Sequence, residues 1–256
     1  MLVLIAQGRN YLKLFNTTEM TKLQEQVGRP REPKVAVCIT TYNGGDYLRQ
    51  MLLSLVDQTF KDFILYIYDD GSNDGTDEII ENFKDRLNIR YFFTSGIHNI
   101  GSVKNRVVKA ALRDKPDLIQ MLDHDDLIEP TFLEEMIKKI EEGFDFVVCN
   151  GVMFGEACAQ IRNRVPDYET IIKDNTLTSW GMFKREVLEQ QNFRRGLAHF
   201  EDWDLYIRLI KLGFKCGVVE KELYNYRMHP GQFHRETQKD FYKHRRNLWE
   251  LHEIEQ

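Results

Sequence analysis

The sequence predicts an α/β protein with a mostly parallel central sheet and helices on both faces, and three observations support this. Short apolar segments alternate with amphipathic ones from residue 35 onward. The apolar segments are continuous, as in LIQML at 118–122, which is typical of strands buried on both faces. Acidic and polar residues follow these segments, where the carboxyl ends of parallel strands form a ligand crevice in open α/β sheets.

The first half of this pattern is regular. Apolar runs predict strands at 35–39, 63–68, 89–93, 118–122 and 144–149. The segment 46–58 predicts a helix because its apolar residues recur on one face. Further helices are expected at 77–87, where Thr76 suits an N-cap, at 102–113, and at 131–142, which Pro130 would open.

The second half is less regular. The stretch 155–170 is polar and predicts a loop over the sheet. Helices are expected at 186–190, 202–213 and 237–253, with Gly213 at the C′ position of the second. Two short strands are expected at 214–219 and 222–227.

Composition excludes several classes of protein. The chain has 256 residues, is 42% hydrophobic and carries a net charge of −5, so nothing favours nucleic acid as a partner. Its four cysteines form no CxxC pair and predict free thiols in a reducing compartment. No apolar run approaches the ~18 residues of a membrane span. We therefore expect a cytoplasmic protein, with attachment to the inner face of the membrane left open.

Carboxylates gather after two of the expected strands. Asp123, Asp125 and Asp126 follow the run 118–122, and three such charges call for a counter-charge, most simply a divalent cation. Asp69 and Asp70 end the strand at 63–68. Residues 70–81 imitate a calcium loop, but a strand precedes them where an EF-hand has a helix. The acidic residues therefore indicate a cation site at the edge of a sheet.

Four segments in order resemble one family. They are ITTYNGGDYLRQMLLSLVDQTF (39–60), YDDGSNDGTDEI (68–79), LDHDD (122–126) and HFEDWDLYIRLIKLG (199–213). Together they resemble the inverting family 2 glycosyltransferases of the GT-A fold, over roughly residues 34–230. The resemblance implies transfer of a sugar from a nucleotide-sugar, expected to be a UDP-sugar, to a hydroxyl acceptor during synthesis of a cell-surface polysaccharide or glycoconjugate.

We expect the chain to divide into three parts. Residues 1–34 would be an N-terminal extension, with a helix around Tyr11–Gln26. Residues 35–235 would be the GT-A domain, with a nucleotide-binding half at 35–126 and a smaller, irregular acceptor half at 127–235. Residues 236–256 would form a C-terminal helix. The extension could serve as a homodimer contact, dock on a membrane or be a remnant of a longer architecture.

The implied donor site lies at the ends of the strands. Nucleotide-binding roles fall on Thr40, Tyr42, Asn43, Asp70, Asn99, Lys104 and Asp123. Asp70 would accept a hydrogen bond from N3–H of uracil, with Asp69 supporting its loop. On spacing alone, residues 40–45 also suit an ordinary turn.

The segment Asp123-His124-Asp125 matches the DXD motif of the family. Asp125 is the expected direct ligand of Mn²⁺ or Mg²⁺, while Asp123 would contact ribose or a metal-bound water. The side chain of His124 is expected to point away from its neighbours, and Asp126 to serve as a helix cap. His229, in Tyr-Arg-Met-His at 226–229, would be a metal ligand or a hydrogen-bond donor to the diphosphate.

By resemblance, Asp202 is the general base that deprotonates the acceptor hydroxyl. Glu201, its neighbour, and Trp180 would support the acceptor side, where the acceptor is a saccharide or lipid-linked saccharide. Without the resemblance, Glu201 and Asp202 would be read as helix capping residues. The run 190–200 is more basic than is usual for the family: Arg194 and Arg195 either favour an acidic acceptor or lipid-linked diphosphate, or are surface charges.

Two other functions fit parts of the sequence. A nucleotidyltransferase also combines carboxylates with Mg²⁺, but it would carry basic residues in the loop after the first strand, and TTYNGGDY has none. A silent sugar- or nucleotide-binding module of the same fold would not need Asp125 and Asp202.

Overall fold

The structure is a computed structural model that describes residues 3–7, 11–15, 34–230 and 240–254. The chain divides into two compact units, Met1–Glu32 and Pro33–Gln256. In the first unit, β1 (Val3–Gln7) pairs antiparallel with β2 (Tyr11–Phe15). The helix expected around 11–26 is therefore wrong for Tyr11–Phe15, and its remaining residues lie outside the described ones. No helix among the described residues is long and apolar enough to cross a membrane.

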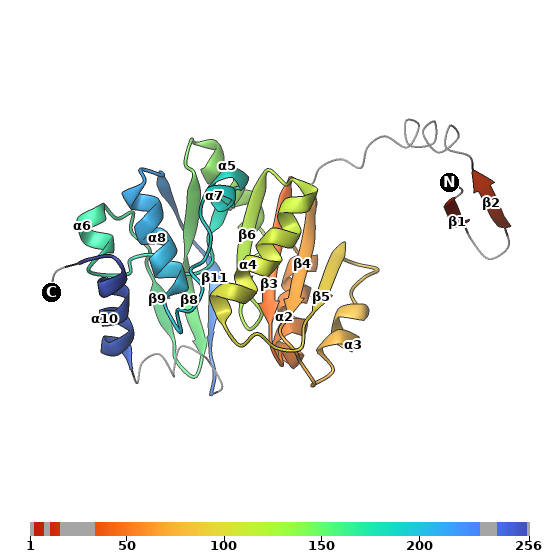
Figure 1. Ribbon diagram of the computed structural model, residues 1–256, viewed down its shortest axis with the longest axis horizontal. Coiled ribbons are helices and arrows are strands. Elements are labelled where there is room, and N and C mark those ends of the chain that lie inside the picture. The colour runs from red at the N-terminus through yellow and green to blue at the C-terminus, as the bar shows by residue number, and fades with distance from the viewer. Residues whose placement is uncertain (1–2, 8–10, 16–33, 231–239, 255–256) are drawn as a thin grey trace. The chain divides into compact units, whose positions relative to one another are not determined.

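The second unit is built on a sheet that has nine strands within the described residues (Figure 1). Its first half is parallel, in the order β5 (Ile89–Phe93), β4 (Phe63–Asp69), β3 (Val35–Thr41) and β6 (Leu118–Asp123). These strands occur where the apolar runs predicted them. The α/β class with helices on both faces is confirmed.

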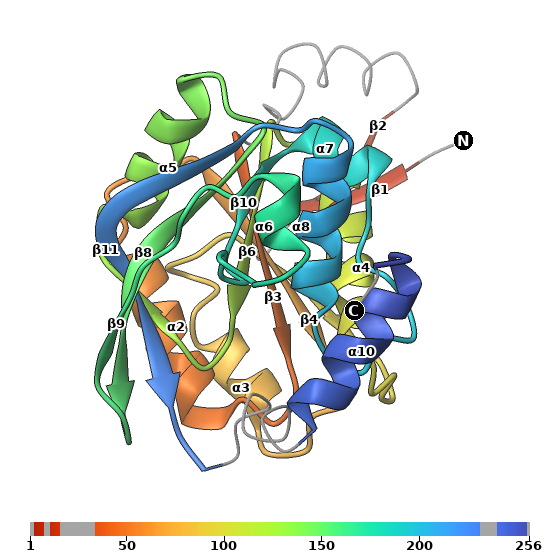
Figure 2. The same ribbon diagram turned by 90° about the vertical axis from the view of Figure 1, so that its left-hand side faces the viewer.

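The second half of the sheet is mixed (Figure 2). A short strand, β10 (Met182–Lys184), runs antiparallel between β6 and β8 (Phe146–Gly155). The long strand β11 (Cys216–Met228) lies parallel to β8 and pairs at its other edge with β7 (Leu127–Ile128). The two short strands expected at 214–219 and 222–227 are thus one strand, with register shifts between Val219 and Tyr224. The expected loop at 155–170 contains β9 (Ala159–Ile161), which pairs with β8.

Helices cover both faces because the buried strands present apolar residues to both sides. In β3, Val35, Val37 and Ile39 pack on one face, and Ala36 and Cys38 pack on the other. The first face is covered by α2 (Gly45–Val56), α3 (Thr76–Glu81) and α5 (Phe132–Glu141). The second is covered by α4 (Ile100–Ala111), α6 (Tyr168–Ile171), α7 (Arg185–Gln190) and α8 (Glu201–Lys211). A single 3₁₀ turn, Leu112–Asp114, follows α4.

The helix ends correct two sequence expectations and confirm a third. The N-cap of α3 is Gly75, whose φ of 82° suits glycine, and Thr76 is the first helical residue. The N-cap of α5 is Thr131, so Pro130 lies before the cap and not in the first turn. Gly213 follows the C-cap of α8 with a φ of 84°, as the C′ prediction requires.

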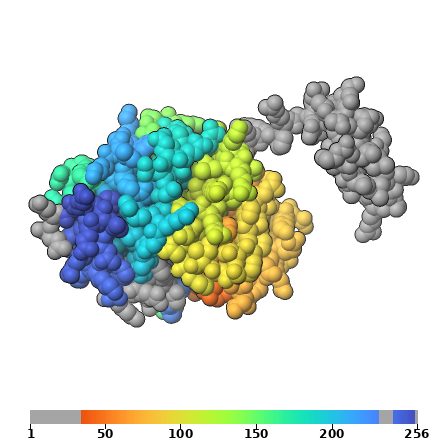
Figure 3. All heavy atoms as spheres, in the orientation of Figure 1, coloured from red at the N-terminus to blue at the C-terminus, as the bar shows by residue number. Residues whose placement is uncertain are grey.

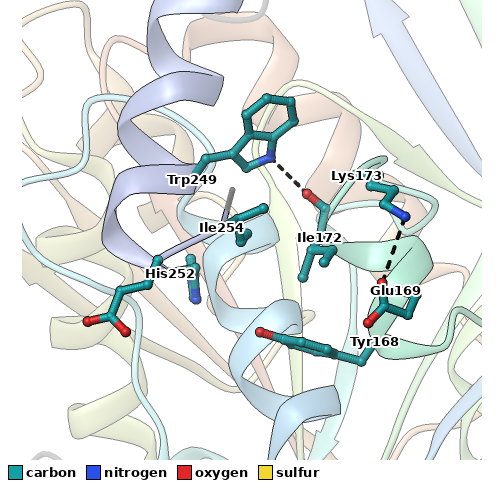
Figure 4. Close-up of a pocket in the computed structure, with 8 residues that line it drawn as sticks. Tyr168, Glu169, Ile172, Lys173, Trp249, His252 and Ile254 are labelled. Carbon is teal, nitrogen blue, oxygen red and sulfur yellow. Dashed lines mark hydrogen bonds and ion pairs between the residues drawn. The ribbon is translucent and has the colours of Figure 1, made fainter. Parts of the chain in front are cut away.

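The C-terminal helix α10 (Phe241–Leu251) packs beside α6. The indole Nε1 of Trp249 donates to the carbonyl of Ile172 at 2.8 Å (Figure 4). Leu248 is fully buried in the second core. A hollow of about 420 Å³ remains between α6 and the end of α10.

Candidate active site

The carboxyl ends of β3, β4 and β6 bring the first predicted site residues to one edge of the sheet. Thr40 is in register with Asp123, and Thr41 is in register with Asp69. Since these strands are parallel and adjacent, the loops that follow them leave the sheet together. The edge therefore has the position of a ligand crevice in an open α/β sheet.

Asp69 and Asp70 organise the loop after β4. Asp69 is buried and its Oδ1 accepts hydrogen bonds from the backbone N–H groups of Gly71 and Ser72, at 3.1 and 2.8 Å. Asp70 accepts from the backbone N–H groups of Ile97 and His98, at 2.6 and 2.8 Å. Asp70 thus fixes the segment before α4, and each of its oxygens keeps a second lone pair for a ligand.

The loop after β3 is tied to the loop after β4. The backbone N–H of Asn43 donates to Ser72 Oγ at 2.8 Å, and Asn43 Oδ1 accepts from the backbone of Asn73 at 3.0 Å. Tyr42 is 49% exposed and meets the ring of His98 edge-on at 5.5 Å. Thr41 Oγ1 is buried and has no hydrogen-bond partner in the described structure. The flat, exposed ring of Tyr42 suits stacking on a nucleoside base.

Two carboxylates of the DXD segment face different partners. Asp123 accepts from Ser179 Oγ at 3.0 Å, and burial, together with Asp125 and Glu201, raises its pKa although Lys104 opposes the shift. Asp125 Oδ2 lies 3.0 Å from Nε2 of His229, and both side chains are largely buried. His124 turns its Nδ1 to the carbonyl of Thr40, at 3.3 Å.

Asp125 and His229 fit a divalent cation that completes its shell with donor phosphates and water. Mg²⁺ is commonly bound by one or two protein carboxylates plus substrate phosphates, and imidazole is compatible with Mn²⁺. Within the described residues no cluster of three or more His, Cys, Asp or Glu side chains could hold a metal. Because the pair offers only two protein ligands, a cation there would depend on the bound nucleotide.

Asp126 has a structural role, and the expectation that it caps a helix is wrong. It is fully buried and accepts from Tyr224 Oη at 2.9 Å and from the backbone N–H of Arg227 at 2.7 Å. The Nε of Arg227 donates to the carbonyl of Asp125 at 2.7 Å. These bonds fasten the DXD turn to β11 and so place His229 opposite Asp125.

Asp202 lies in the first turn of α8, beside a buried ion pair. Lys104 Nζ on α4 is 2.7 Å from Glu201 Oε1, and both side chains are less than 10% exposed. Burial and the charge of Glu201 raise the pKa of Asp202 to about 7, against the opposing effect of Lys104. Asp123 raises it further, so Asp202 and the DXD segment share one electrostatic environment. A carboxylate with a pKa near neutrality suits a general base.

Two predicted site residues lie in the surrounding structure. The side chain of Asn99 caps α4 by accepting from Ser102 N, and its Nδ2 donates to the carbonyl of Leu197. Trp180 is 2% exposed, donates its Nε1 to the carbonyl of Cys149, and stacks on Tyr224 at 3.8 Å. Asn99 therefore fixes the start of α4, and Trp180 packs in the core against the tyrosine that binds Asp126.

Sequence reasoning missed Ser179, Arg227 and Tyr47. Ser179 holds Asp123, and the ring of Tyr47 lies 4.6 Å from that of His229. The Tyr-Arg-Met-His segment could have identified Arg227, because it places this arginine two residues before the predicted ligand His229. Ser179 carries no signal, since an isolated serine in an irregular stretch has no distinguishing pattern. Arg194 pairs with Asp204 at 2.8 Å, which accounts for one of the two charges left open in the sequence.

Comparisons with known proteins bear on the family and the fold of this chain. Residues 36–195 match the family model described as glycosyl transferase family 2. EpsH of Bacillus subtilis (strain 168) is 26% identical over 235 residues, which cover 85% of this chain and 67% of EpsH.

Two solved structures share the fold. Residues 1–349 of S. aureus TarS, in complex with UDP-GlcNAc, align with a TM-score of 0.71 and 21% identity over 84% of this chain and 65% of that one. The mannosyltransferase PcManGT from Pyrobaculum calidifontis, in complex with GDP-Man and Mn²⁺, aligns with a TM-score of 0.62 and 16% identity over 80% of this chain and 59% of that one. This chain thus spans less than two thirds of either, and the likeness confirms the GT-A fold.

Proposed function

Because the chain belongs to glycosyl transferase family 2, we propose that it transfers a sugar, with inversion and with a divalent cation, from a UDP-sugar to a hydroxyl of a saccharide or lipid-linked saccharide. The observation that carries this proposal is the position of Asp202, which lies in the first turn of α8 beside the buried pair of Glu201 with Lys104, where the charge of Asp123 also acts on it. A candidate base and the candidate diphosphate site therefore lie within electrostatic reach of each other.

The donor would lie along the ends of the strands. Tyr42 offers its exposed ring to the base, and Asp70 accepts from N3–H of uracil with a remaining lone pair. The UDP-GlcNAc bound to the TarS structure supports a UDP-sugar, whereas PcManGT holds GDP-Man. The test of the donor site therefore compares uracil with guanine nucleotides.

Asp125 and His229 would hold Mn²⁺ or Mg²⁺, which would neutralise charge on the leaving diphosphate. The Mn²⁺ of the PcManGT complex supports the use of a divalent cation. Asp123, held by Ser179, would orient the ribose or a metal-bound water. Because Lys104 is paired with Glu201, it would act on the donor only indirectly, through that ion pair.

Asp202 would take the proton of the acceptor hydroxyl as that oxygen attacks the anomeric carbon from the face opposite the diphosphate. A single in-line displacement inverts the configuration and needs no covalent intermediate. Glu201 and Lys104 would fix the first turn of α8, so that the carboxylate of Asp202 stays within hydrogen-bond reach of the acceptor. Trp180 would form the packed wall behind the acceptor.

A thermal-shift titration with UDP and GDP, with and without Mn²⁺, tests the donor site. We expect UDP to stabilise the protein more than GDP does, and more with Mn²⁺ than without. Equal stabilisation by GDP would contradict the uracil role of Asp70, and indifference to Mn²⁺ would contradict the metal site. Cleavage of UDP-sugars with Mn²⁺ then separates a transferase from a silent binding module, which would leave every donor intact.

A further inference from the structure

A second hollow lies outside the candidate active site, against the outer surface of α4. It has a volume of about 410 Å³. Four cationic side chains line it, and none of its lining residues is acidic; its charged members are Arg106, Lys109, Arg113 and Arg195. The first three recur on one face of α4 and the turn that follows it. None of the predicted donor, metal or base residues lines this hollow.

Within the part of the chain that the structure describes, none of these four cationic side chains forms an ion pair, although the whole chain carries a net charge of −5. Arg106 instead donates to Tyr68 Oη at 3.1 Å. Like charges gathered around a concavity repel one another, so an anion bound between them would relieve that repulsion.

The hollow is built on fixed elements. Tyr68 and Phe92, from β4 and β5, stack at 6.1 Å and form its apolar part. Asn105 exchanges two hydrogen bonds with the backbone of Phe193, at 2.7 and 2.9 Å. Figure 3 shows α4 and the segment 191–200 side by side on this face. The two hydrogen bonds of Asn105 fix Phe193, two residues before Arg195, against α4.

We infer that this hollow binds a phosphate or diphosphate group of the acceptor. Three of its four cations are arginines, whose planar forks pair with phosphate oxygens in a bidentate manner. The segment that bears Arg195 runs directly into α8, which carries Asp202. α4 also carries Lys104, which pairs with Glu201 beside Asp202, so an acceptor anchored here by a charged group would reach the base across α4.

A bilayer of anionic lipid offers similar headgroup chemistry but fits the hollow less well. Membrane docking combines cations with exposed apolar side chains that insert beside them. Phe93 is 59% exposed, but it follows Phe92 along β5 and so faces the opposite side of the sheet. The concave shape and the buried ring of Tyr68 favour a discrete anion.

Calorimetric titration with inorganic pyrophosphate, in buffer free of divalent metal, tests the site. The triple variant Arg106→Gln, Lys109→Gln, Arg113→Gln is compared with a control of equal charge change, Lys138→Gln, Lys139→Gln, Lys211→Gln. We expect the dissociation constant to rise about ten-fold or more in the first variant and less than about two-fold in the control. Equal weakening in both, or no binding by the wild-type protein, would overturn the inference.

The acceptor role rests on the proposed function, whereas pyrophosphate binding does not. UDP affinity in the presence of Mn²⁺ should be unchanged in both triple variants, so a failure of the hollow is distinguishable from a failure of the donor site. Sedimentation with phosphatidylglycerol vesicles is the second arm. If the first variant loses vesicle binding but keeps pyrophosphate affinity, the hollow is a membrane contact and the inference is wrong.

Discussion

At the scale of residues, the chemistry depends on a balance of charges around Asp202. Burial and the charge of Glu201 raise the pKa of this carboxyl, and the charge of Lys104 lowers it. Glu201 and Lys104 also form an ion pair with each other. If Lys104 were absent, two adjacent carboxylates would share a buried site and Asp202 would be protonated at neutral pH. The buried lysine would therefore keep the proposed base, Asp202, ionised near neutral pH.

We predict that transfer depends on a group that titrates at about pH 7. A general base works only when deprotonated, so the rate should rise with pH through about 7 and then level off. Asp202→Asn should lower kcat by about 10²–10⁴ and leave UDP affinity unchanged. Measured pH–rate profiles of both proteins check this.

The variant Glu201→Gln tests the cause of the raised pKa of Asp202. Removing the charge of Glu201 removes a cause of the raised pKa of Asp202, so the rising limb should move to lower pH. A variant Asp202→Asn that keeps transfer within a few-fold of wild type would place the base elsewhere.

The pairing of Asp125 with His229 makes a separate prediction about metal. Asp125→Asn and His229→Ala should each abolish the additional thermal stabilisation that Mn²⁺ gives to the UDP complex, because each removes a ligand. Asp46→Asn, a change at an exposed carboxylate, is the control and should behave as wild type. A Mn²⁺ effect that survives in His229→Ala would restrict the role of this histidine to hydrogen bonding.

At the scale of elements, the placement of His229 depends on the contact between β8 and β11. A Cβ built on Gly151 of β8 would lie 2.4 Å from the carbonyl oxygen of Tyr224 on β11. The two strands can approach this closely only because a glycine stands there. Tyr224 in turn binds Asp126, so this backbone contact helps to set the DXD turn.

We predict that Gly151→Ala lowers the free energy of unfolding by about 1–3 kcal/mol, because backbone must move to admit the methyl group. It should also weaken Mn²⁺-dependent UDP binding, since β11 carries the segment that leads to His229. Gly217→Ala, on the same strand pair, is the control: there the nearest atoms, at 2.8 Å, belong to the partly buried side chain of Phe144 and not to backbone, so we expect a smaller loss. Urea unfolding of both variants measures the difference, and equal costs would contradict this account.

The long strands and helices could be predicted from sequence because their signals are local. The run 118–122 and the apolar face of 46–58 each repeat a pattern over several residues, and β6 and α2 occur there. The strands β7, β9 and β10 have two or three residues each, too few to show a period. Their positions follow from pairing with distant strands, which no local pattern encodes.

The same division applies to the site. The carboxylates of the DXD segment could be found because they follow a buried strand. The partners that orient them come from far along the chain: Ser179 is 56 residues from Asp123, and Arg227 is 102 residues from Asp125. Contacts between residues so far apart in the sequence depend on the folded structure, so no local spacing of residues predicts them.

At the scale of the whole molecule, one buried carboxylate joins α8 to two other segments of the chain. Asp204, on α8, is fully buried and binds Arg194, Arg208 and His252, the last of these just beyond α10. Burial alone would raise the pKa of Asp204, but hydrogen bonds and charges from these partners lower it to about 2. The Asp204 network therefore fastens the C-terminal helix and the segment 191–200 to the helix that bears the base.

The depressed pKa of Asp204 predicts how stability changes in acid. A carboxyl with a folded pKa of about 2 and an ordinary value of 3.8 stabilises the fold fully above pH 3.8 and loses that contribution as the pH falls through 2. The contribution is roughly 2 kcal/mol, since each unit of difference between the folded and the ordinary pKa corresponds to about 1.4 kcal/mol. Asp204→Asn should therefore lower the free energy of unfolding at pH 6 by about 3 kcal/mol, because Arg194, Arg208 and His252 lose their acceptor. Urea unfolding at pH 6, 4 and 3 should show the gap to wild type narrowing, whereas Asp174→Asn, at an exposed position, should match wild type throughout. A gap that stays constant with pH would mean that Asp204 acts through packing and not through its charge.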